Sequence, residues 1–370
     1  MSNTLGWAAE NAHEQVVNLL LDRDDVDPNK VDEDGQTPLL RATRSGQEGI
    51  VKMLLERDDV DPNQSDDEGE TALCYASENG HEGMVKMLLC RNDIDPDKAS
   101  DDETALSLAT FFRHPGVVRM LLGRDDVNPN KQGFGGDTPL GWGVWNGDEE
   151  VVKMLLGRRD TNPNNTDKSG RTPLWWAASS GNEEMVKMLL ARGDVLPEKP
   201  DHRGQTPLSC AAENGNDEVV GILLWLDDVN PNQRDNNGNT PLSYAAWNGH
   251  EGVAVKLLGL GNANPNIANN NGQTPLWCAA GAGHEGMVKI LLRRNVNPGA
   301  ADINGQSPLH SAAKNGHVGV MNMLVGWGGV NPFMPDVYGN TPLMYLQGRI
   351  SIRSMIDQLQ PRTGAAPSTD

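Results

Sequence analysis

One motif recurs along the whole chain at a nearly constant spacing, and this repeat constrains the fold more than any other feature. Thr-Pro-Leu or a close variant begins at ten positions: Thr37, Thr71, Thr104, Thr138, Thr172, Thr206, Thr240, Thr274, Ser307 and Thr341. A degenerate copy, Asn3-Thr4-Leu5, makes eleven units, which follow one another at intervals of 33 or 34 residues. A fixed period of this length is typical of repeat proteins, in which each unit is one small supersecondary element.

Each unit reads as a turn, a short helix, a second turn and a second helix. In the copy over residues 235–266, Thr240 suits a helix N-cap and Pro241 suits the first helical position. Gly249 can end the helix, because glycine readily adopts the positive φ of a residue that follows a helix. The second helix carries an apolar stripe, and Asn-Pro-Asn stops it. Helices this short are unstable alone, so each unit must bury its apolar face against its neighbours.

The repeat closely resembles that of the ankyrin family, whose signature is T-P-L-H-x-A-A…G-H-x-x-V-V-x-L-L-L. The resemblance covers residues 1 to about 358. It implies an all-α fold, an ankyrin-repeat solenoid of helix–turn–helix units with projecting turn fingers. The loop motif D-V-D-P-N, with an added residue and a proline, is similar to ankyrin repeats of filamentous fungi.

Three units depart from the pattern. Repeat 4 has Ala105 for the proline and Arg113-His114-Pro115 for Gly-His-Glu. Repeat 5 has Gly141 and Gly143 where alanine or another small residue normally stands. Repeat 11 loses the Gly-His motif and has a polar second helix, predicted over residues 352–359.

The first and last units are both atypical, which indicates polar capping repeats at residues 1–30 and 336–360. We therefore expect a single ankyrin-repeat solenoid over residues 1–360. Residues 361–370 are expected to form a disordered tail.

Composition excludes several classes of partner. The formal net charge is −20 and the pI is near 4.7, which argues against nucleic acids and anionic membranes because both need a cationic surface. The N-terminus has no charged and apolar segments of a signal peptide, and no apolar run approaches the roughly 18 residues that span a bilayer. Four scattered cysteines are too few for a disulfide framework. We expect a monomer in the cytoplasm, with the nucleus as the alternative.

Residues that often carry chemistry follow the repeat and predict no site. Six of the eight histidines occupy the same repeat position, ten residues after the motif begins, and in the family His310 would have a structural hydrogen-bonding role. The four cysteines are expected to be small, buried and inert. The loop over residues 133–136 lacks the spacing of a phosphate-binding motif. We expect no metal and no cofactor, and the catalytic residues of any enzymatic activity are unknown.

The repeat does not explain the aromatic residues. There are 9 Trp against 4 Phe and 4 Tyr, and 12 of these 17 residues lie on predicted first helices. With the motif threonine as position 0, positions +2, +5, +6 and +9 are small or apolar and should pack. Positions +4, +7, +8 and +11 share the opposite face. In ankyrin proteins the first helices line the concave side, so the resemblance implies that this face looks into a groove.

We expect a ligand or partner to bind on this face in repeats 4 to 8. The candidate residues are Phe111, Phe112, Trp142, Trp145, Trp176, Glu213, Tyr244 and Trp247. Position +7 faces solvent in the family, so Phe111, Trp145 and Trp247 would expose large apolar area without a folding reason.

At position +4, Trp142 and Trp176 have a second interpretation, because rings there often pack on the next repeat. Gly141 and Gly143 flank Trp142, and each weakens the helix by about 1 kcal/mol relative to Ala. We interpret the two glycines as leaving space that a ligand needs.

Two functions are open. The first is a binding scaffold that holds a basic or aromatic-rich protein or peptide in an acidic, aromatic-lined concave groove. A cation over an indole face gains about 0.5–1 kcal/mol when exposed and about 2 kcal/mol when desolvated. The second is a small-molecule-binding protein or a cofactor-free enzyme of cyclase or isomerase type. Its apolar or cationic ligand would occupy the Trp-rich pocket, with Glu213 handling a proton.

Overall fold

The computed structural model describes residues 4–98 and 103–346. The chain divides into two compact units. Unit 1 comprises residues 1–177 and 184–196, and unit 2 comprises residues 178–183 and 197–370. The prediction of a single domain over residues 1–360 stays a prediction.

Unit 1 is built from pairs of short helices joined by turns. Its first helices are α1 (Thr4–Glu10), α3 (Pro38–Arg44), α5 (Ala72–Glu78), α7 (Ala105–Phe111), α9 (Pro139–Asn146) and α11 (Pro173–Ser180). Its second helices are α2 (Glu14–Leu21), α4 (Glu48–Leu55), α6 (Glu82–Leu89), α8 (Pro115–Leu122), α10 (Glu149–Gly157) and α12 (Glu183–Leu190). A short 3-10 helix, η1 (Phe134–Gly136), lies in the finger of repeat 5. The division between the units falls within α11 and at the start of α12.

Unit 2 repeats the same design. Its first helices are α13 (Pro207–Asn214), α15 (Pro241–Asn248), α17 (Pro275–Ala282) and α19 (Pro308–Asn315), followed by the 3-10 helix η2 (Pro342–Leu346). Its second helices are α14 (Asp217–Leu224), α16 (Glu251–Gly259), α18 (Glu285–Leu292) and α20 (Val318–Trp327). The predicted second helix of repeat 11 and the predicted tail lie outside the described residues.

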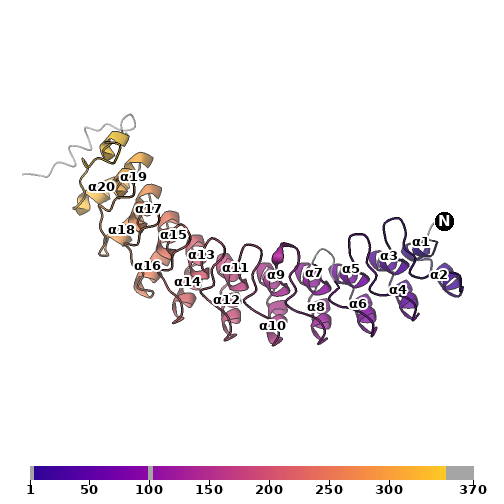
Figure 1. Ribbon diagram of the computed structural model, residues 1–370. Helices are drawn as coiled ribbons and strands as arrows, with labels where there is room; N and C mark the ends of the chain where they lie inside the picture. The colour runs from indigo at the N-terminus through magenta and orange to yellow at the C-terminus, as the bar shows by residue number, and fades with distance from the viewer. Residues whose placement is uncertain (1–3, 99–102, 347–370) are drawn as a thin grey trace, which may run out of the picture. The chain divides into compact units, whose positions relative to one another are not determined.

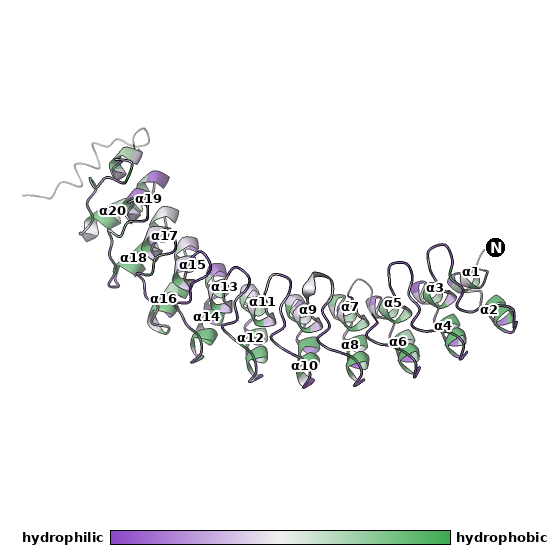
Figure 2. Ribbon diagram, viewed as in Figure 1, coloured by the Kyte–Doolittle hydropathy of each residue, from purple (hydrophilic) through white to green (hydrophobic). Residues whose placement is uncertain are grey.

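Within each unit, helices pack on their counterparts in neighbouring repeats, as α1 does on α3 and α2 on α4, so that first helices form one row and second helices another (Figure 1). The second helices are largely hydrophobic, whereas the connecting loops are hydrophilic (Figure 2). The predicted all-α solenoid of helix–turn–helix units with fingers is confirmed over the described residues.

The motif residues act locally as the sequence predicts. The Thr240 hydroxyl accepts a hydrogen bond from the N–H of Ser243 at 3.2 Å, and Pro241 begins α15. Leu242 at position +2 is fully buried, as are the alanines at +5 and +6. Position +9 differs from the prediction that it packs. Gly249 ends α15 with a φ of 78° and is partly exposed, because it serves the chain reversal.

An aspartate shapes most of the fingers. In repeat 8, Asp235 is 7% exposed, and its Oδ1 atom accepts hydrogen bonds from the backbone N–H groups of Asn237 and Asn239, at 2.9 and 2.7 Å. Its Oδ2 atom accepts the hydroxyl proton of Tyr244 at 2.6 Å. The aspartate therefore joins the finger to the first helix. Repeat 5 has Gly133 at this position.

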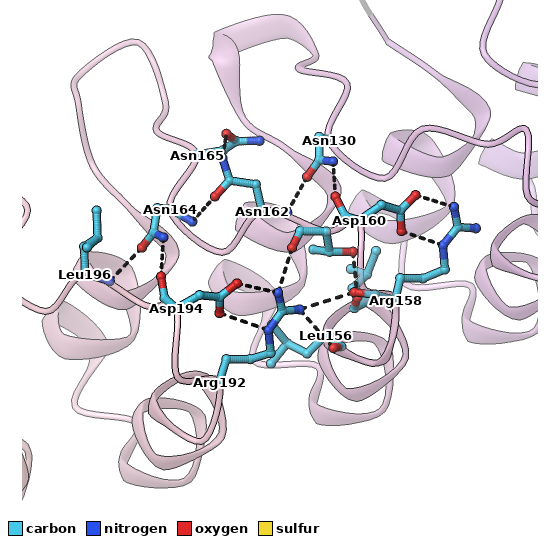
Figure 3. Close-up of polar contacts among 12 residues, drawn as sticks. Asn130, Leu156, Arg158, Asp160, Asn162, Asn164, Asn165, Arg192, Asp194 and Leu196 are labelled. Carbon is cyan, nitrogen blue, oxygen red and sulfur yellow. Dashed lines mark hydrogen bonds and ion pairs between the residues drawn. The ribbon is translucent and has the colours of Figure 1, made fainter.

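An arginine at position +20 clamps consecutive repeats of unit 1 together. Arg192 pairs with both oxygens of Asp194, at 3.1 and 2.7 Å (Figure 3). Its Nη atoms also donate to the carbonyl oxygens of Leu156, Arg158 and Thr161 in the preceding repeat, at 3.1, 3.3 and 3.1 Å. We call this arrangement the arginine clamp. The equivalent residues Arg57, Arg91, Arg124 and Arg158 make similar contacts.

The asparagine of the Pro-Asn loop adds a second tie between repeats. Asn164 Nδ2 donates to the carbonyl oxygen of Asp194 at 2.7 Å, and Asn164 Oδ1 accepts from the N–H of Leu196 at 2.8 Å (Figure 3). Asn130 bridges to Asp160 and Asn162 in the same way. The recurring loop motif thus has a structural role, since its polar groups satisfy the backbone of the next repeat.

Candidate functional site

The eight predicted site residues fall into two groups. Five lie in unit 1, namely Phe111, Phe112, Trp142, Trp145 and Trp176, and three lie in unit 2, namely Glu213, Tyr244 and Trp247. Each group has a geometry of its own within its unit.

Four of the residues in unit 1 form an aromatic cluster, made of Phe111 on α7, Phe112 at the C-cap of α7, and Trp142 and Trp145 on α9. Ring centroids lie 4.7 Å apart for Phe111 and Trp142, and 5.9 Å apart for Trp142 and Trp145, both edge-on. Phe112 meets Phe111 at 5.0 Å. Trp145 is 56% exposed and Phe111 is 38% exposed, whereas Trp142 is half-buried. The cluster therefore presents aromatic edges and faces to solvent from two packed helices.

The tryptophan at the centre of this cluster has an unusual polar environment. Tyr75 and Tyr244 occupy the same repeat position and donate their hydroxyl protons to finger aspartates. Trp142 has Gly133 in the place of that aspartate, and its buried indole N–H has no acceptor among the described residues. The hydrogen bond that joins finger and helix in repeats 3 and 8 is therefore absent at the aromatic cluster.

The absence of side chains at the two glycines of α9 has a different physical reason from the one that the sequence suggested. A Cβ atom on Gly143 would lie 3.0 Å from Val152 Cγ2 and 3.4 Å from Val151 Cγ1, both on α10. A Cβ atom on Gly141 would meet Asp137 Oδ1 at 3.3 Å. The interpretation as room for a ligand is wrong for Gly143, because the protein's own side chains fill that space.

Trp176 is engaged by the protein itself. The guanidinium of Arg171 lies 4.1 Å from the centroid of Trp176 and 5.5 Å from that of Trp175. Arg171 Nε also pairs with Asp167 at 2.7 Å, which fixes the cation over the ring. Trp176 already has a cation partner, so a ligand would have to displace Arg171 to use its face.

Asp137 precedes α9 and is a half-buried carboxylate. Burial raises its pKa to about 6, and repulsion by Asp167 and Glu103 acts in the same direction, while Arg171 opposes them. A raised folded-state pKa penalises the ionised form, so this group favours folding below the unfolded pKa near 3.9 and loses that contribution as the pH rises through 6.

Replacing Asp137 with Asn should therefore stabilise the protein at pH 7.5 and leave it little changed at pH 4. A shift of about two pKa units would correspond to about 3 kcal/mol, but solvent screens this partly exposed group, so we expect about 1 kcal/mol. Urea unfolding at the two pH values measures the difference. An equal effect at both values would contradict the assignment.

The three residues in unit 2 line one pocket, which we call the Trp247 pocket. Its volume is about 370 Å³. The lining residues are Glu213, Asn239, Ser243, Tyr244, Trp247, Asn248, Asn269, Gln273 and Cys278. The structure thus brings together Glu213 of repeat 7 and Tyr244 and Trp247 of repeat 8, which the sequence placed only on the same face, and adds residues of repeat 9 to the lining.

Side-chain size along the row of first helices explains this pocket. Tyr244 and Trp247 stand at positions +4 and +7 of repeat 8, whereas repeat 9 has Cys278 and Gly281 at the same positions. Trp247 is 52% exposed, and Cys278 is buried. A large pair beside a small pair leaves a hollow walled by the Tyr and Trp rings.

Hydrogen bonds hold the polar groups of the pocket in place. Gln205 Nε2 donates to Glu213 Oε2. Asn269 Nδ2 donates to Asn239 Oδ1 at 3.0 Å and to Gln273 Oε1 at 3.1 Å. Burial and the neighbouring Asp235 raise the pKa of the Tyr244 hydroxyl above its usual range. Glu213 is the one acidic side chain of the lining, and no Lys or Arg belongs to it, so the pocket suits a hydrogen-bond donor or a cation.

Histidines and cysteines have structural environments. His250 Nε2 contacts the carbonyl oxygen of Glu213 at 2.9 Å, and His114 contacts that of Glu78 at 2.8 Å, each tying one repeat to the one before. Burial raises the pKa of the Cys278 thiol to about 12. Cys90 is exposed at the end of α6, which corrects the expectation that every cysteine is buried. The described residues contain no group of three His, Cys, Asp or Glu side chains placed to hold a metal ion.

One exposed apolar surface was not foreseen from the sequence. The fingers and loop of repeats 10 and 11 expose Ile303, Phe333, Met334, Val337 and Tyr338, each by 58% to 69%. The signal was present, because most earlier fingertips carry polar residues where these carry apolar ones, with Phe134 of repeat 5 as the exception.

In the part of the chain that the structure describes, no helix is both long enough and apolar enough to cross a membrane. No curated protein matches the chain. A family model described as ankyrin repeats (3 copies) matches six overlapping stretches: residues 5–100, 59–133, 92–167, 140–235, 194–262 and 252–336. Ankyrin repeats generally mediate protein–protein binding. Because the matched stretches run without a gap from residue 5 to residue 336, the chain belongs to the ankyrin-repeat family.

Proposed function

We propose that the protein is a binding scaffold that holds a basic or aromatic-rich protein or peptide on its first helices, in an acidic groove lined by aromatic side chains. The observation that carries this proposal is the exposure of large aromatic side chains on packed helices. Trp145 and Trp247 at position +7 are 56% and 52% exposed, and Phe111 is 38% exposed. Exposed indoles on a rigid surface are typical binding hot spots.

Charge selects the class of partner. The chain has 51 acidic and 31 basic residues, of which 38 and 21 lie in residues 1–200. The lining of the Trp247 pocket has one carboxylate and no Lys or Arg. A field of this sign attracts cationic partners and raises their association rate at low salt. We place the complex in the cytoplasm or nucleus and expect a monomeric scaffold.

The pocket volume favours a second candidate function, binding of a small cationic or apolar molecule. Ligand pockets in proteins span about 300–1,000 Å³, and the Trp247 pocket has about 370 Å³. Catalysis there has less support. Tyr244 and Cys278 both have raised pKa values, so neither exchanges a proton readily near pH 7.

A double replacement of Trp145 and Trp247 by Ala tests the scaffold. Binding to a synthetic library of Lys-, Arg- and aromatic-rich peptides should weaken at least about tenfold for each indole removed. The free energy of unfolding should fall by no more than about 1 kcal/mol, because both side chains are half exposed. Fluorescence anisotropy and urea unfolding measure the two quantities.

A matched control uses two other exposed tryptophans. Trp225 and Trp327 lie at the ends of second helices and are 78% and 53% exposed. Their replacement by Ala should leave peptide binding unchanged. Equal losses from both double variants, or loss from neither, would contradict the proposal.

A further inference from the structure

We propose that the Trp247 pocket takes the side chain of a lysine, with the ammonium group at Glu213 and the alkyl stem along the Trp247 ring. The inference rests on the proposed function, since the lysine belongs to the partner. It goes further by naming the side chain that the pocket selects.

Shape is the first argument. The hollow lies between the rings of Tyr244 and Trp247 and the small Cys278. A hydrogen bond from the Tyr244 hydroxyl to Asp235 holds one wall in place, at 2.6 Å. An extended alkyl chain can bury its methylene groups against these rings while its charged end stays among polar groups.

Charge is the second argument. Glu213 is the one acidic side chain of the lining, and Asp235 adds a second carboxyl group, which accepts the hydrogen bond of the Tyr244 hydroxyl. No Lys or Arg belongs to the lining to neutralise them. An ammonium group would gain the attraction of both carboxylates and of the indole face.

Hydrogen-bond geometry distinguishes lysine from arginine. A guanidinium binds best when it meets both oxygens of a carboxylate side by side. Gln205 already donates to Glu213 Oε2, which leaves Oε1 as the open oxygen. An ammonium group has three separate donors and needs single acceptors. The amide oxygens of Asn239 and Gln273 supply them, because Asn269 fixes each with one hydrogen bond and each keeps a second lone pair.

The test uses the full-length protein labelled with 5-fluorotryptophan and mimics of the two side chains. The variant Trp247→Phe assigns the fluorine signal of Trp247. Titration with n-butylammonium should shift this signal, whereas 1-butanol should not, and n-propylguanidinium should bind at least about threefold more weakly. Glu213→Gln should weaken n-butylammonium at least about tenfold, because a charge-assisted hydrogen bond is lost.

Two further variants make the result specific. Glu78 occupies position +7 of repeat 3, so Glu78→Gln removes the same charge from the same repeat position and should change the affinity less than twofold. Gln205→Leu frees Glu213 Oε2 and should reverse the order, so that n-propylguanidinium binds at least as well as n-butylammonium. Equal effects of Glu78→Gln and Glu213→Gln, or tighter guanidinium binding to the wild type, would overturn the inference.

The outcomes separate this inference from the proposed function. Peptide binding that depends on Trp145 with no fluorine response at Trp247 would disprove the lysine pocket and leave the scaffold standing. A specific n-butylammonium response without any peptide binding would disprove the scaffold. It would identify the pocket as a site for a free alkylammonium ion.

Discussion

Replacing Arg158 with Ala should lower the free energy of unfolding by about 3 kcal/mol. The Arg158 guanidinium pairs with Asp160 and donates to the carbonyl oxygens of Leu122, Arg124 and Val127, at 3.2, 2.7 and 3.1 Å. A hydrogen bond from a charged donor contributes about 1.5–3 kcal/mol, but water can reach some of the released carbonyls, so the sum is discounted. Urea unfolding followed by circular dichroism measures the change.

Two controls separate the clamp from the loss of a charge. Arg294 stands at the same repeat position in repeat 9, where the loop is one residue shorter and has no aspartate two residues on. Arg294→Ala should change stability by less than about 0.5 kcal/mol. Arg158→Lys keeps the charge but not the planar fork, so it should recover less than half of the loss. A full recovery with Lys would show that charge alone stabilises this loop.

The clamp also distinguishes the two units. Position +20 is Arg in repeats 1 to 6, whereas Leu226, Leu260 and Trp327 replace it in repeats 7, 8 and 10. Unit 2 has polar ties between consecutive fingers. The N–H of Asn270 bonds to the carbonyl of Asn237 at 2.9 Å, and the N–H of Ile303 bonds to that of Asn271 at 3.0 Å. Fingertip bonds also occur in unit 1, where the N–H of Lys168 bonds to the carbonyl of Gly135 at 3.0 Å, and the asparagine tie of the loops recurs in unit 2 at Asn266. The arginine at position +20 is therefore the tie that differs between the units.

The repeat period predicted the fold because each motif residue acts locally. Thr240 caps a helix, Pro241 starts it and Gly249 reverses the chain, and none of these roles depends on distant parts of the protein. Gly143 shows the limit of this reasoning. A side chain at this position would crowd Val151 and Val152 on the next helix. Such a contact between helices has no signature in the local sequence.

The candidate site was predictable in part. Periodicity placed Trp145 and Trp247 on the exposed face, and both are more than half exposed. It was harder to predict which of the site residues line one pocket. The Trp247 pocket arises from a size difference between side chains of repeats 8 and 9 and from hydrogen bonds to Gln205 and Asn269. Those partners lie at fingers, and the periodicity of the helices carries no signal for contacts between a finger and a helix.

Asp235 provides the second large effect, since its replacement by Ala should cost about 3 kcal/mol. Three donors would lose their acceptor, namely the backbone N–H groups of Asn237 and Asn239 and the hydroxyl of Tyr244. Each buried donor left without a partner costs about 1–3 kcal/mol, and water reaches the finger more easily than the hydroxyl. Urea unfolding of the variant measures the loss.

Asp235→Asn is the matched control, because the protein itself uses Asn at this position in repeat 9. There Asn269 Oδ1 accepts from the backbone N–H groups of Asn271 and Gln273, both at 3.0 Å. We therefore expect Asp235→Asn to cost only about 1 kcal/mol, since it keeps the finger and loses the charged acceptor of Tyr244.

The pKa of Tyr244, raised by burial and by Asp235, should fall in this variant, and alkaline titration of phenolate absorbance measures it. If Ala and Asn cost the same, the finger hydrogen bonds would not be the source of the stability. Peptide binding should follow the same order, because the wall of the Trp247 pocket depends on the position of Tyr244.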